Sequence, residues 1–126
     1  MGLIEDEHKS FIEEVGLCYV ATASSDGEPN VSPKGSIMVL DEDHLAFADI
    51  MSPGSRANLE QNQRVAVYVC RPEKFQGFQF KGTAELAQDG PVYDRLAAAI
   101  EEKGLKLPPI QNAVTVTVKE IRGLGE

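Results

Sequence analysis

The chain has 126 residues, a mass of 13.7 kDa and a formal net charge of −8. Domains usually contain roughly 100–150 residues, so we expect a single domain over residues 1–126. Hydrophobic residues make up 42% and charged residues 25%, which is typical of a globular protein rather than a disordered chain. An acidic surface repels nucleic acids and anionic membranes, so neither is expected as a partner.

The same inventory predicts a cytoplasmic protein without a metal site. The longest apolar run, residues 65–70, is far shorter than the ~20 residues of a membrane helix. Acidic residues at positions 5–7 stand where a secretory signal would be basic and then apolar. Cys18 and Cys70 are too few for a disulfide framework and lie in apolar runs, which predicts buried packing residues. The two histidines are far apart in the sequence, which argues against a zinc site.

The hydrophobic pattern of the first half predicts one helix followed by strands. Residues 3–15 place apolar side chains at helical spacing, with His8 on the apolar face as a packing residue. Extended segments are expected at residues 17–23, 31–40 and 44–48. Their connections are too short for crossover helices, which predicts an antiparallel meander.

The second half predicts two more short helices and three more strands. Pro53 and the flanking serines indicate a helix start, with the helix over residues 56–62. Another helix opens at residues 89–91 and stops at Gly104. Strand patterns occur at residues 64–70, 78–86 and 114–118. Six or seven strands with three short helices predict a closed or partly closed barrel.

Two short stretches rich in serine, glycine and a basic residue are candidates for an anion site. Residues 32–36 combine two hydroxyls with the ammonium of Lys34 at a strand bend. Residues 52–56 place hydroxyls and the guanidinium of Arg56 at a helix start, where unpaired N–H groups favour an anion. These residues alone support two interpretations equally: a phosphate bound between the stretches, or helix caps and a surface lysine.

Several motifs in order resemble the FMN-binding split-barrel family typified by pyridoxamine 5′-phosphate oxidase. These motifs are residues 29–36, 39–41, 45–49, 54–59, 62–65 and 80–85. Residues 77–82, with residues 89–91 after them, are particularly similar to the small FMN-binding protein of sulfate-reducing bacteria. The resemblance implies a mainly β fold, a six-stranded antiparallel split barrel of Greek-key type with two or three short helices. It also implies a homodimer with FMN at the subunit interface.

The resemblance further implies which residues bind the cofactor. The strand bend would face the flavin ring and ribityl chain, the next strand would line the ring, and the helix start would hold the phosphate. The implied residues are Ser32, Pro33, Lys34, Gly35, Ser36, Ala48, Asp49, Ile50, Ser55 and Arg56. One departure concerns the phosphate: where the oxidase has Arg followed by Lys, this chain has Gly54 and Ser55. No side chain is expected to be catalytic, because a flavin carries the redox chemistry itself.

We therefore expect an FMN-binding flavoprotein that transfers electrons or acts as an oxidoreductase with an unassigned small-molecule or protein redox partner. Oxidation of pyridoxamine phosphate is not expected, because residues 121–126 lack the Arg-x-His element of the oxidase. Two alternatives remain: a reductase that uses an F420-type deazaflavin, and a non-catalytic barrel that binds haem or another small ligand. The F420 tail would require a more basic groove, and no histidine lies in the expected cleft to ligate haem iron.

Overall fold

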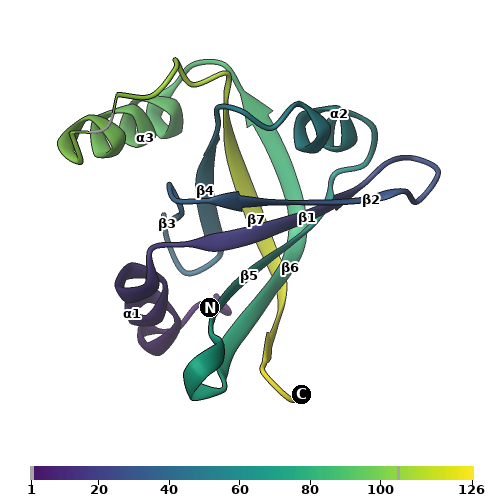
Figure 1. The fold of residues 1–126 in the computed structure, drawn as a ribbon, viewed down its shortest axis with the longest axis vertical. Coiled ribbons are helices and arrows are strands. Elements are labelled where there is room, and N and C mark those ends of the chain that lie inside the picture. The colour runs from purple at the N-terminus through teal and green to yellow at the C-terminus, as the bar shows by residue number, and fades with distance from the viewer. Residues whose placement is uncertain (1, 105) are drawn as a thin grey trace.

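One antiparallel sheet organises the molecule in the computed structural model, which describes residues 2–104 and 106–126 (Figure 1). Within these residues the strands are β1 (Cys18–Ala23), β2 (Pro29–Lys34), β3 (Met38–Val39), β4 (His44–Asp49), β5 (Arg64–Arg71), β6 (Gln76–Ala87) and β7 (Asn112–Gly123). The helices are α1 (Asp6–Val15), α2 (Pro53–Gln61) and α3 (Pro91–Glu102), and a short 3₁₀ turn covers Pro72–Lys74. No helix among the described residues is long and apolar enough to cross a membrane.

The strand order, β2-β1-β5-β6-β7-β4-β3, explains why the sheet curls. The two edge strands, β2 and β3, follow each other in the chain and are joined by residues 35–37 alone. The sheet therefore bends until its edges approach each other, which gives a split barrel. The predicted meander is correct for the hairpins β1–β2 and β3–β4. It is wrong between β2 and β3, which lie at opposite edges of the hydrogen-bonded sheet.

The structure has seven strands rather than the six that the family resemblance implied. The extra strand arises because the predicted segment 31–40 divides into β2 and β3. At the corner between them, the hydroxyl of Ser36 accepts a hydrogen bond from the backbone N–H of Ala48 at 2.9 Å. A side chain thus pairs with β4 where the backbone has turned away from the ladder.

Gly82 permits the bend of the two longest strands, β6 and β7. The register between them shifts between Lys81 and Gly82. A Cβ atom at position 82 would lie 1.9 Å from the carbonyl oxygen of Thr117, so no other residue fits there without moving the backbone. Bulges of this kind increase the local bend of a sheet, which helps it to close.

The interior of the barrel is filled by alternate residues of the strands. Its fully buried members include Val20, Leu45, Phe47, Val67, Val69, Phe80, Val114 and Val116. Burying an aliphatic or aromatic side chain of this size contributes about 1.5–3 kcal/mol relative to leaving it exposed. The largest stabilising term is therefore the apolar core that the strands enclose.

Helix α1 covers one end of this core, and His8 packs there as predicted. The imidazole is buried and stands edge-on to the ring of Phe78, with 4.8 Å between the ring centroids. Its Nδ1 atom accepts a hydrogen bond from the backbone N–H of Glu5 at 2.9 Å. Because this bond ties the side chain to the first turn of α1, His8 serves as a helix cap and a core residue together.

The two cysteines have different environments. Cys18 is completely buried in the core, as predicted, and burial raises the pKa of its thiol to about 12. Cys70 is only partly buried, so the prediction of a core residue is correct for Cys18 and only partly correct for Cys70.

Helices α2 and α3 lie at the other end of the molecule from α1 (Figure 1). Leu96 fixes α3 on the sheet, since it is completely buried and packs in one cluster with Ala46 of β4 and Ala113 of β7. The hydroxyl of Tyr93 adds a hydrogen bond of 2.9 Å to the carbonyl oxygen of Ile110. The helix is thereby held beside the corner between β2 and β3.

Candidate functional site

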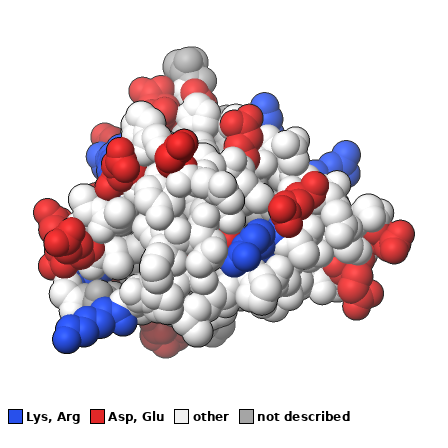
Figure 2. All heavy atoms as spheres, turned by 90° about the horizontal axis from the view of Figure 1, so that it is seen from above, with Lys and Arg blue, Asp and Glu red and all other residues white. Residues whose placement is uncertain are grey.

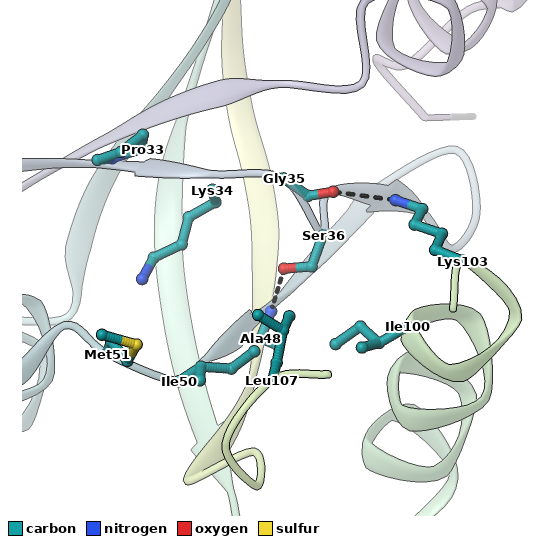
Figure 3. Close-up of a pocket in the computed structure, with 10 residues that line it drawn as sticks. All are labelled: Pro33, Lys34, Gly35, Ser36, Ala48, Ile50, Met51, Ile100, Lys103 and Leu107. Atoms are coloured by element: carbon teal, nitrogen blue, oxygen red, sulfur yellow. Dashed lines mark hydrogen bonds between the residues drawn. The ribbon is translucent and has the colours of Figure 1, made fainter. Parts of the chain in front are cut away.

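A cavity of about 220 Å³ lies between the β2–β3 corner, the end of β4 and α3 (Figure 3). Its walls are formed by Pro33, Lys34, Gly35, Ser36, Ala48, Ile50, Met51, Ile100, Lys103 and Leu107. The fold thus brings the predicted residues of positions 33–36 together with Ala48 and Ile50. These two predicted segments come from different strands, and their meeting defines the candidate site.

The remaining wall residues were not predicted from the sequence. Met51 directly follows Ile50, while Ile100 and Lys103 belong to the α3 region. A signal for Ile100 and Lys103 was present, because helical spacing places both on one stripe of the predicted third helix, together with Val92, Leu96 and Ala99. That stripe indicates that α3 packs on the sheet, but it does not indicate which part of the sheet it covers.

Two polar contacts hold the corner that forms the cavity wall. Ser36 is bonded to the backbone of Ala48, and the ammonium of Lys103 donates a hydrogen bond of 3.0 Å to the carbonyl oxygen of Gly35. Figure 3 shows Lys103 reaching from the end of α3 to this carbonyl. The side chain of a single lysine therefore connects α3 to the β2–β3 corner.

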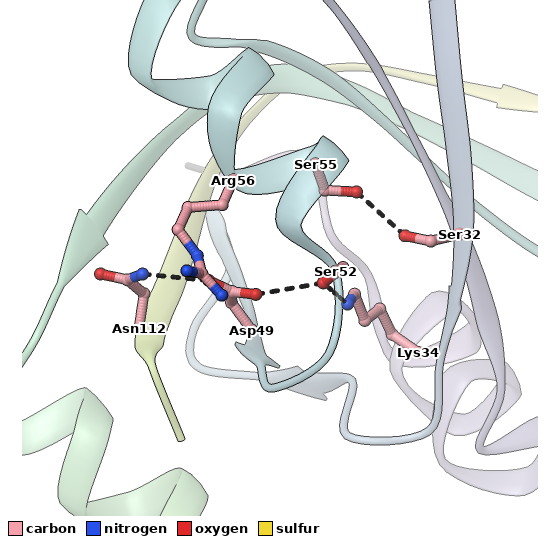
Figure 4. A network of polar contacts seen from close by, with 7 residues as sticks. All are labelled: Ser32, Lys34, Asp49, Ser52, Ser55, Arg56 and Asn112. Atoms are coloured by element: carbon pink, nitrogen blue, oxygen red, sulfur yellow. Dashed lines mark hydrogen bonds and ion pairs between the residues drawn. The ribbon is translucent and has the colours of Figure 1, made fainter. Parts of the chain in front are cut away.

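Two of the remaining predicted site residues, Asp49 and Arg56, lie beside the cavity in a polar network centred on Asp49 (Figure 4). Its carboxylate accepts hydrogen bonds from Arg56 Nε at 2.7 Å, from Asn112 Nδ2 at 3.0 Å and from Ser52 Oγ at 3.1 Å. The ammonium of Lys34 donates a hydrogen bond to the hydroxyl of Ser52. The network therefore extends from the wall of the cavity to the first turn of α2. We call these five residues the Asp49 network.

The electrostatics of the Asp49 network follow from its burial and its pairing. Burial raises the pKa of Asp49, but the hydrogen bonds from Arg56, Asn112 and Ser52 outweigh burial and hold the pKa below its usual range. Burial lowers the pKa of Lys34, and the neighbouring carboxylate of Asp49 offsets part of that shift. Asp49 therefore stays ionised at neutral pH and supplies the negative charge that stabilises the two basic groups around it.

Ser32 and Ser55 meet on the seam between β2 and α2 rather than in the cavity wall. Their hydroxyls share a hydrogen bond of 3.0 Å, and Asn30 Nδ2 donates a further bond to Ser55 Oγ at 3.1 Å. A Cβ atom at position 54 would lie 3.0 Å from Asn30 Oδ1. The arginine that the oxidase has at this position would therefore crowd Asn30.

The start of α2 retains the features of an anion site. No side chain caps this end of the helix, although Ser52 occupies the N-cap position. The first N–H groups of a helix have no partner within it, and the helix dipole favours negative charge there. Arg56 adds a partly exposed guanidinium to the same turn.

Sequence reasoning missed two members of the Asp49 network. Ser52 was expected only as a helix cap, whereas its hydroxyl connects Lys34 to Asp49. Asn112 carried no signal at all, since it lies 63 positions from Asp49 and reaches it because the two residues are paired across β4 and β7. Lys34 is itself buried, so the interpretation as a surface charge is wrong.

Figure 2 shows the end of the molecule that carries α2 and α3. Part of this surface is free of Lys, Arg, Asp and Glu, but a basic side chain and neighbouring acidic ones also lie near its middle. Two wall residues of the cavity are among the exposed large apolar side chains of the molecule, Met51 at 75% and Leu107 at 46% of their full exposure.

Several solved structures share this architecture. An FMN-binding protein of Syntrophomonas wolfei has a TM-score of 0.75 at 16% identity, covering 94% of this chain and 84% of that one. An F420 reductase scores 0.72 at 20% identity, covering 94% and 98%. The haem storage protein HutZ of Vibrio cholerae scores 0.70 at 21%, covering 97% and 94%. At these identities the likeness shows the fold alone, and the predicted similarity to the small FMN-binding protein of sulfate-reducing bacteria stays a prediction.

Two further comparisons carry sequence similarity as well. An uncharacterised protein of Methanocaldococcus jannaschii is 35% identical over an alignment of 126 positions, which covers 97% of this chain and 80% of that protein. The crystal structure of HupZ from Group A Streptococcus has a TM-score of 0.85 at 26% identity, covering 96% of this chain and 94% of that one. Residues 4–125 also match the family described as pyridoxamine 5′-phosphate oxidase. Because that match spans nearly the whole chain and the fold is a split barrel, this protein belongs to the pyridoxamine 5′-phosphate oxidase family.

Proposed function

We propose that this protein binds FMN in the cavity between the β2–β3 corner and α3, and that it transfers electrons or acts as an oxidoreductase through this cofactor. The observation that carries the proposal is the Asp49 network. It connects Lys34 in the cavity wall with Arg56 at the start of α2. Donors for a flavin ring and donors for its phosphate thus lie in one continuous array.

The chemistry of the residues fits the two ends of FMN. Ala48, Ile50 and Met51 offer apolar surface to a ring, while Lys34 and Ser36 offer polar atoms at its edge. The free N–H groups of α2 and the guanidinium of Arg56 suit a phosphate. Flavins supply hydride and electron transfer when bound, and the protein binds and orients them.

Lys34 has a further role in this proposal. Its position places a cation in the cavity wall, and the Asp49 network restrains the ammonium through Ser52. Positive charge next to a flavin ring favours its reduced, anionic form by simple charge attraction. Lys34 is therefore expected to raise the reduction potential of the cofactor rather than to move a proton.

The proposed functional unit is a homodimer. A flavin ring has two broad apolar faces, whereas this cavity is bordered by the exposed apolar side chains of Met51 and Leu107. A second copy of the chain would cover the open face of the ring together with Met51 and Leu107. Sedimentation of the FMN-loaded protein is expected to give a dimer at micromolar concentration, and a monomer that binds FMN tightly would contradict this.

Two proteins of similar fold are an F420 reductase and a haem storage protein, so the identity of the ligand is the first thing to test. Among the described wall residues, Met51 is the one side chain of a kind that ligates haem iron. We expect the absorption spectrum of the purified protein, and of the molecule released on denaturation, to be that of FMN. A Soret band or a deazaflavin spectrum would overturn the proposal.

The variant Arg56→Ala tests whether Arg56 binds the phosphate of FMN. A charge-assisted hydrogen bond contributes about 1.5–3 kcal/mol, so FMN affinity should fall about ten- to hundred-fold in titrations of the cofactor-free protein. Riboflavin lacks the phosphate, so its affinity should stay within about twofold. Arg122→Ala is the matched control, because Arg122 is also paired with a carboxylate, that of Glu120, but lies outside the cavity wall. Equal losses for FMN and riboflavin would remove Arg56 from the phosphate site.

A further inference from the structure

A second hollow adjoins the proposed flavin cavity on the side of α3. It encloses about 360 Å³ between α1, residues 36–39 and α3. Ser36, Ile100 and Lys103 line both spaces. Since Lys103 reaches across to Gly35, its side chain forms part of the wall between them.

The second hollow gathers positive charge in a strongly acidic protein. Lys9 of α1, Arg95 of α3 and Lys103 line it, against the single carboxylate of Glu13. The chain has 12 basic and 20 acidic residues in all, so a site with three cations and one anion departs from the average of the molecule. We call this space the basic hollow.

The charges of the basic hollow are also unpaired. Within residues 2–104 and 106–126, none of its three cations makes an ion pair with a carboxylate, whereas Arg56, Arg71 and Arg122 each do. Acidic residues are near, because Lys9 and Arg95 also border a smaller space lined by Glu5, Asp6, Asp41 and Glu42. Lys9 and Arg95 therefore lie between the basic hollow and an acidic neighbouring space, and neither forms an ion pair with the described carboxylates of that space.

We propose that the basic hollow binds the phosphate or carboxylate group of a small-molecule redox substrate whose remaining part reaches the flavin cavity. This inference rests on the proposed function, because it is the flavin that gives the neighbouring cavity its role. The hollow is of the size that takes a small organic anion, and unpaired ammonium and guanidinium groups bind such anions through charge-assisted hydrogen bonds.

Lys103 is the residue that connects the two spaces. Its ammonium has a neutral carbonyl as its partner, so exchange of that bond for one to an anion adds charge attraction. The long flexible side chain can make this exchange without movement of α3, which Leu96 anchors on the sheet. Lys103 would then hold the substrate at the shared wall, next to Ser36.

The test uses the FMN-loaded protein, in which the phosphate site at α2 is occupied. Inorganic pyrophosphate and succinate are titrated separately, and binding is followed by the flavin difference spectrum and by NMR shifts of the backbone amides of α3. We expect saturable binding of at least one probe, which the double variant Lys9→Gln/Arg95→Gln weakens at least tenfold. Preference for pyrophosphate would indicate a phosphorylated substrate, and preference for succinate a carboxylate.

The control is Lys81→Gln, an exposed lysine on β6 outside both cavity walls, which should leave probe binding unchanged. Equal weakening by the control would indicate nonspecific attraction and overturn the proposal, as would binding that survives the double variant. If the protein fails to bind FMN, the proposed function fails, and the same NMR titration on the cofactor-free protein still decides whether the basic hollow binds anions.

Discussion

Two polar regions border the same cavity, and they differ in how their charges are paired. On the side of α2, the carboxylate of Asp49 accepts three hydrogen bonds and is buried together with Ser52 and Asn112, while Arg56 is partly exposed. On the side of α3, Lys9, Arg95 and Lys103 are exposed and form no ion pair within the described residues.

The difference separates stability from binding. A buried charge must be hydrogen-bonded and paired, since an uncompensated one costs several kcal/mol, so the Asp49 network contributes to the folded state as well as to the site. Exposed cations stay solvated in the folded protein, so they change the free energy of folding little. They also remain free to bind an anionic ligand. We therefore expect substitutions in the Asp49 network to change stability, and substitutions of the three cations of the basic hollow to change binding alone.

The largest effect is expected when the support of the basic hollow is removed. Leu96→Ala deletes a completely buried side chain that fixes α3 to β4 and β7, and such changes cost about 2–5 kcal/mol. Urea denaturation should show this loss, together with weaker pyrophosphate binding. Ala98→Gly on the exposed side of α3 is the control and should cost about 1 kcal/mol. A loss of less than 1 kcal/mol for Leu96→Ala would mean that α3 is held by other contacts.

Asp49→Asn is the next largest change, and it contrasts the two regions directly. The amide keeps the shape of the side chain but leaves Lys34 and Arg56 without their counter-charge. Because Arg56 is partly exposed, we expect a loss of about 2 kcal/mol at pH 7, below the usual cost of breaking a fully buried pair. Arg95→Gln should change the free energy of unfolding by no more than about 0.5 kcal/mol. Equal losses for the two variants would contradict the distinction between paired and unpaired charges.

The pH dependence of stability sharpens the same contrast. The folded-state pKa of Asp49 lies below its usual value, so the unfolded chain takes up the proton first as the pH falls. The stability contributed by the carboxylate is therefore complete above about pH 4 and is lost as the pH falls through the lowered pKa. The gap in unfolding free energy between the native protein and Asp49→Asn should narrow from pH 6 to pH 3. A gap that stays constant would show that Asp49 is not the titrating group.

The smallest effect concerns the flavin. Lys34→Met removes the cation of the cavity wall and should lower the reduction potential by roughly 20–40 mV, which corresponds to about 1–2 kcal/mol for two electrons. His44→Ala and Cys70→Ser are controls, since neither residue lines the cavity, and both should keep the potential and reoxidise in air at near-normal rates. A shift in either control as large as that of Lys34→Met would mean that the potential is not set at the cavity wall.

Local patterns predicted most of the elements correctly. The helical spacing of residues 3–15 identified α1 and the packing of His8, and Pro53 marked the start of α2. The predicted start of the first helix is imprecise. The pattern placed it at residue 3, whereas α1 begins at Asp6, after the capping interaction between Glu5 and His8. Such features depend on residues within one or two turns of each other, which is why a sequence reports them.

The candidate site was predicted only in part. The resemblance to flavoproteins brought the residues of positions 33–36 together with Ala48 and Ile50, and the structure places them around one cavity. It did not separate these wall residues from Ser32 and Ser55, which face each other on the seam of α2. Whether a strand residue lies in a wall or behind it depends on the curl of the sheet, which no local pattern encodes.

The sequence by itself determined the helices, most of the strands and the acidic character of this protein, because these follow from side chains close together in the chain. The tertiary structure decided that β2 and β3 lie at opposite edges of the sheet and that Asn112 meets Asp49. It also decided that Lys9 and Arg95 share one hollow with Lys103. These arrangements depend on which strands pair across long loops, and that choice is made by the burial of the whole core rather than by any single segment.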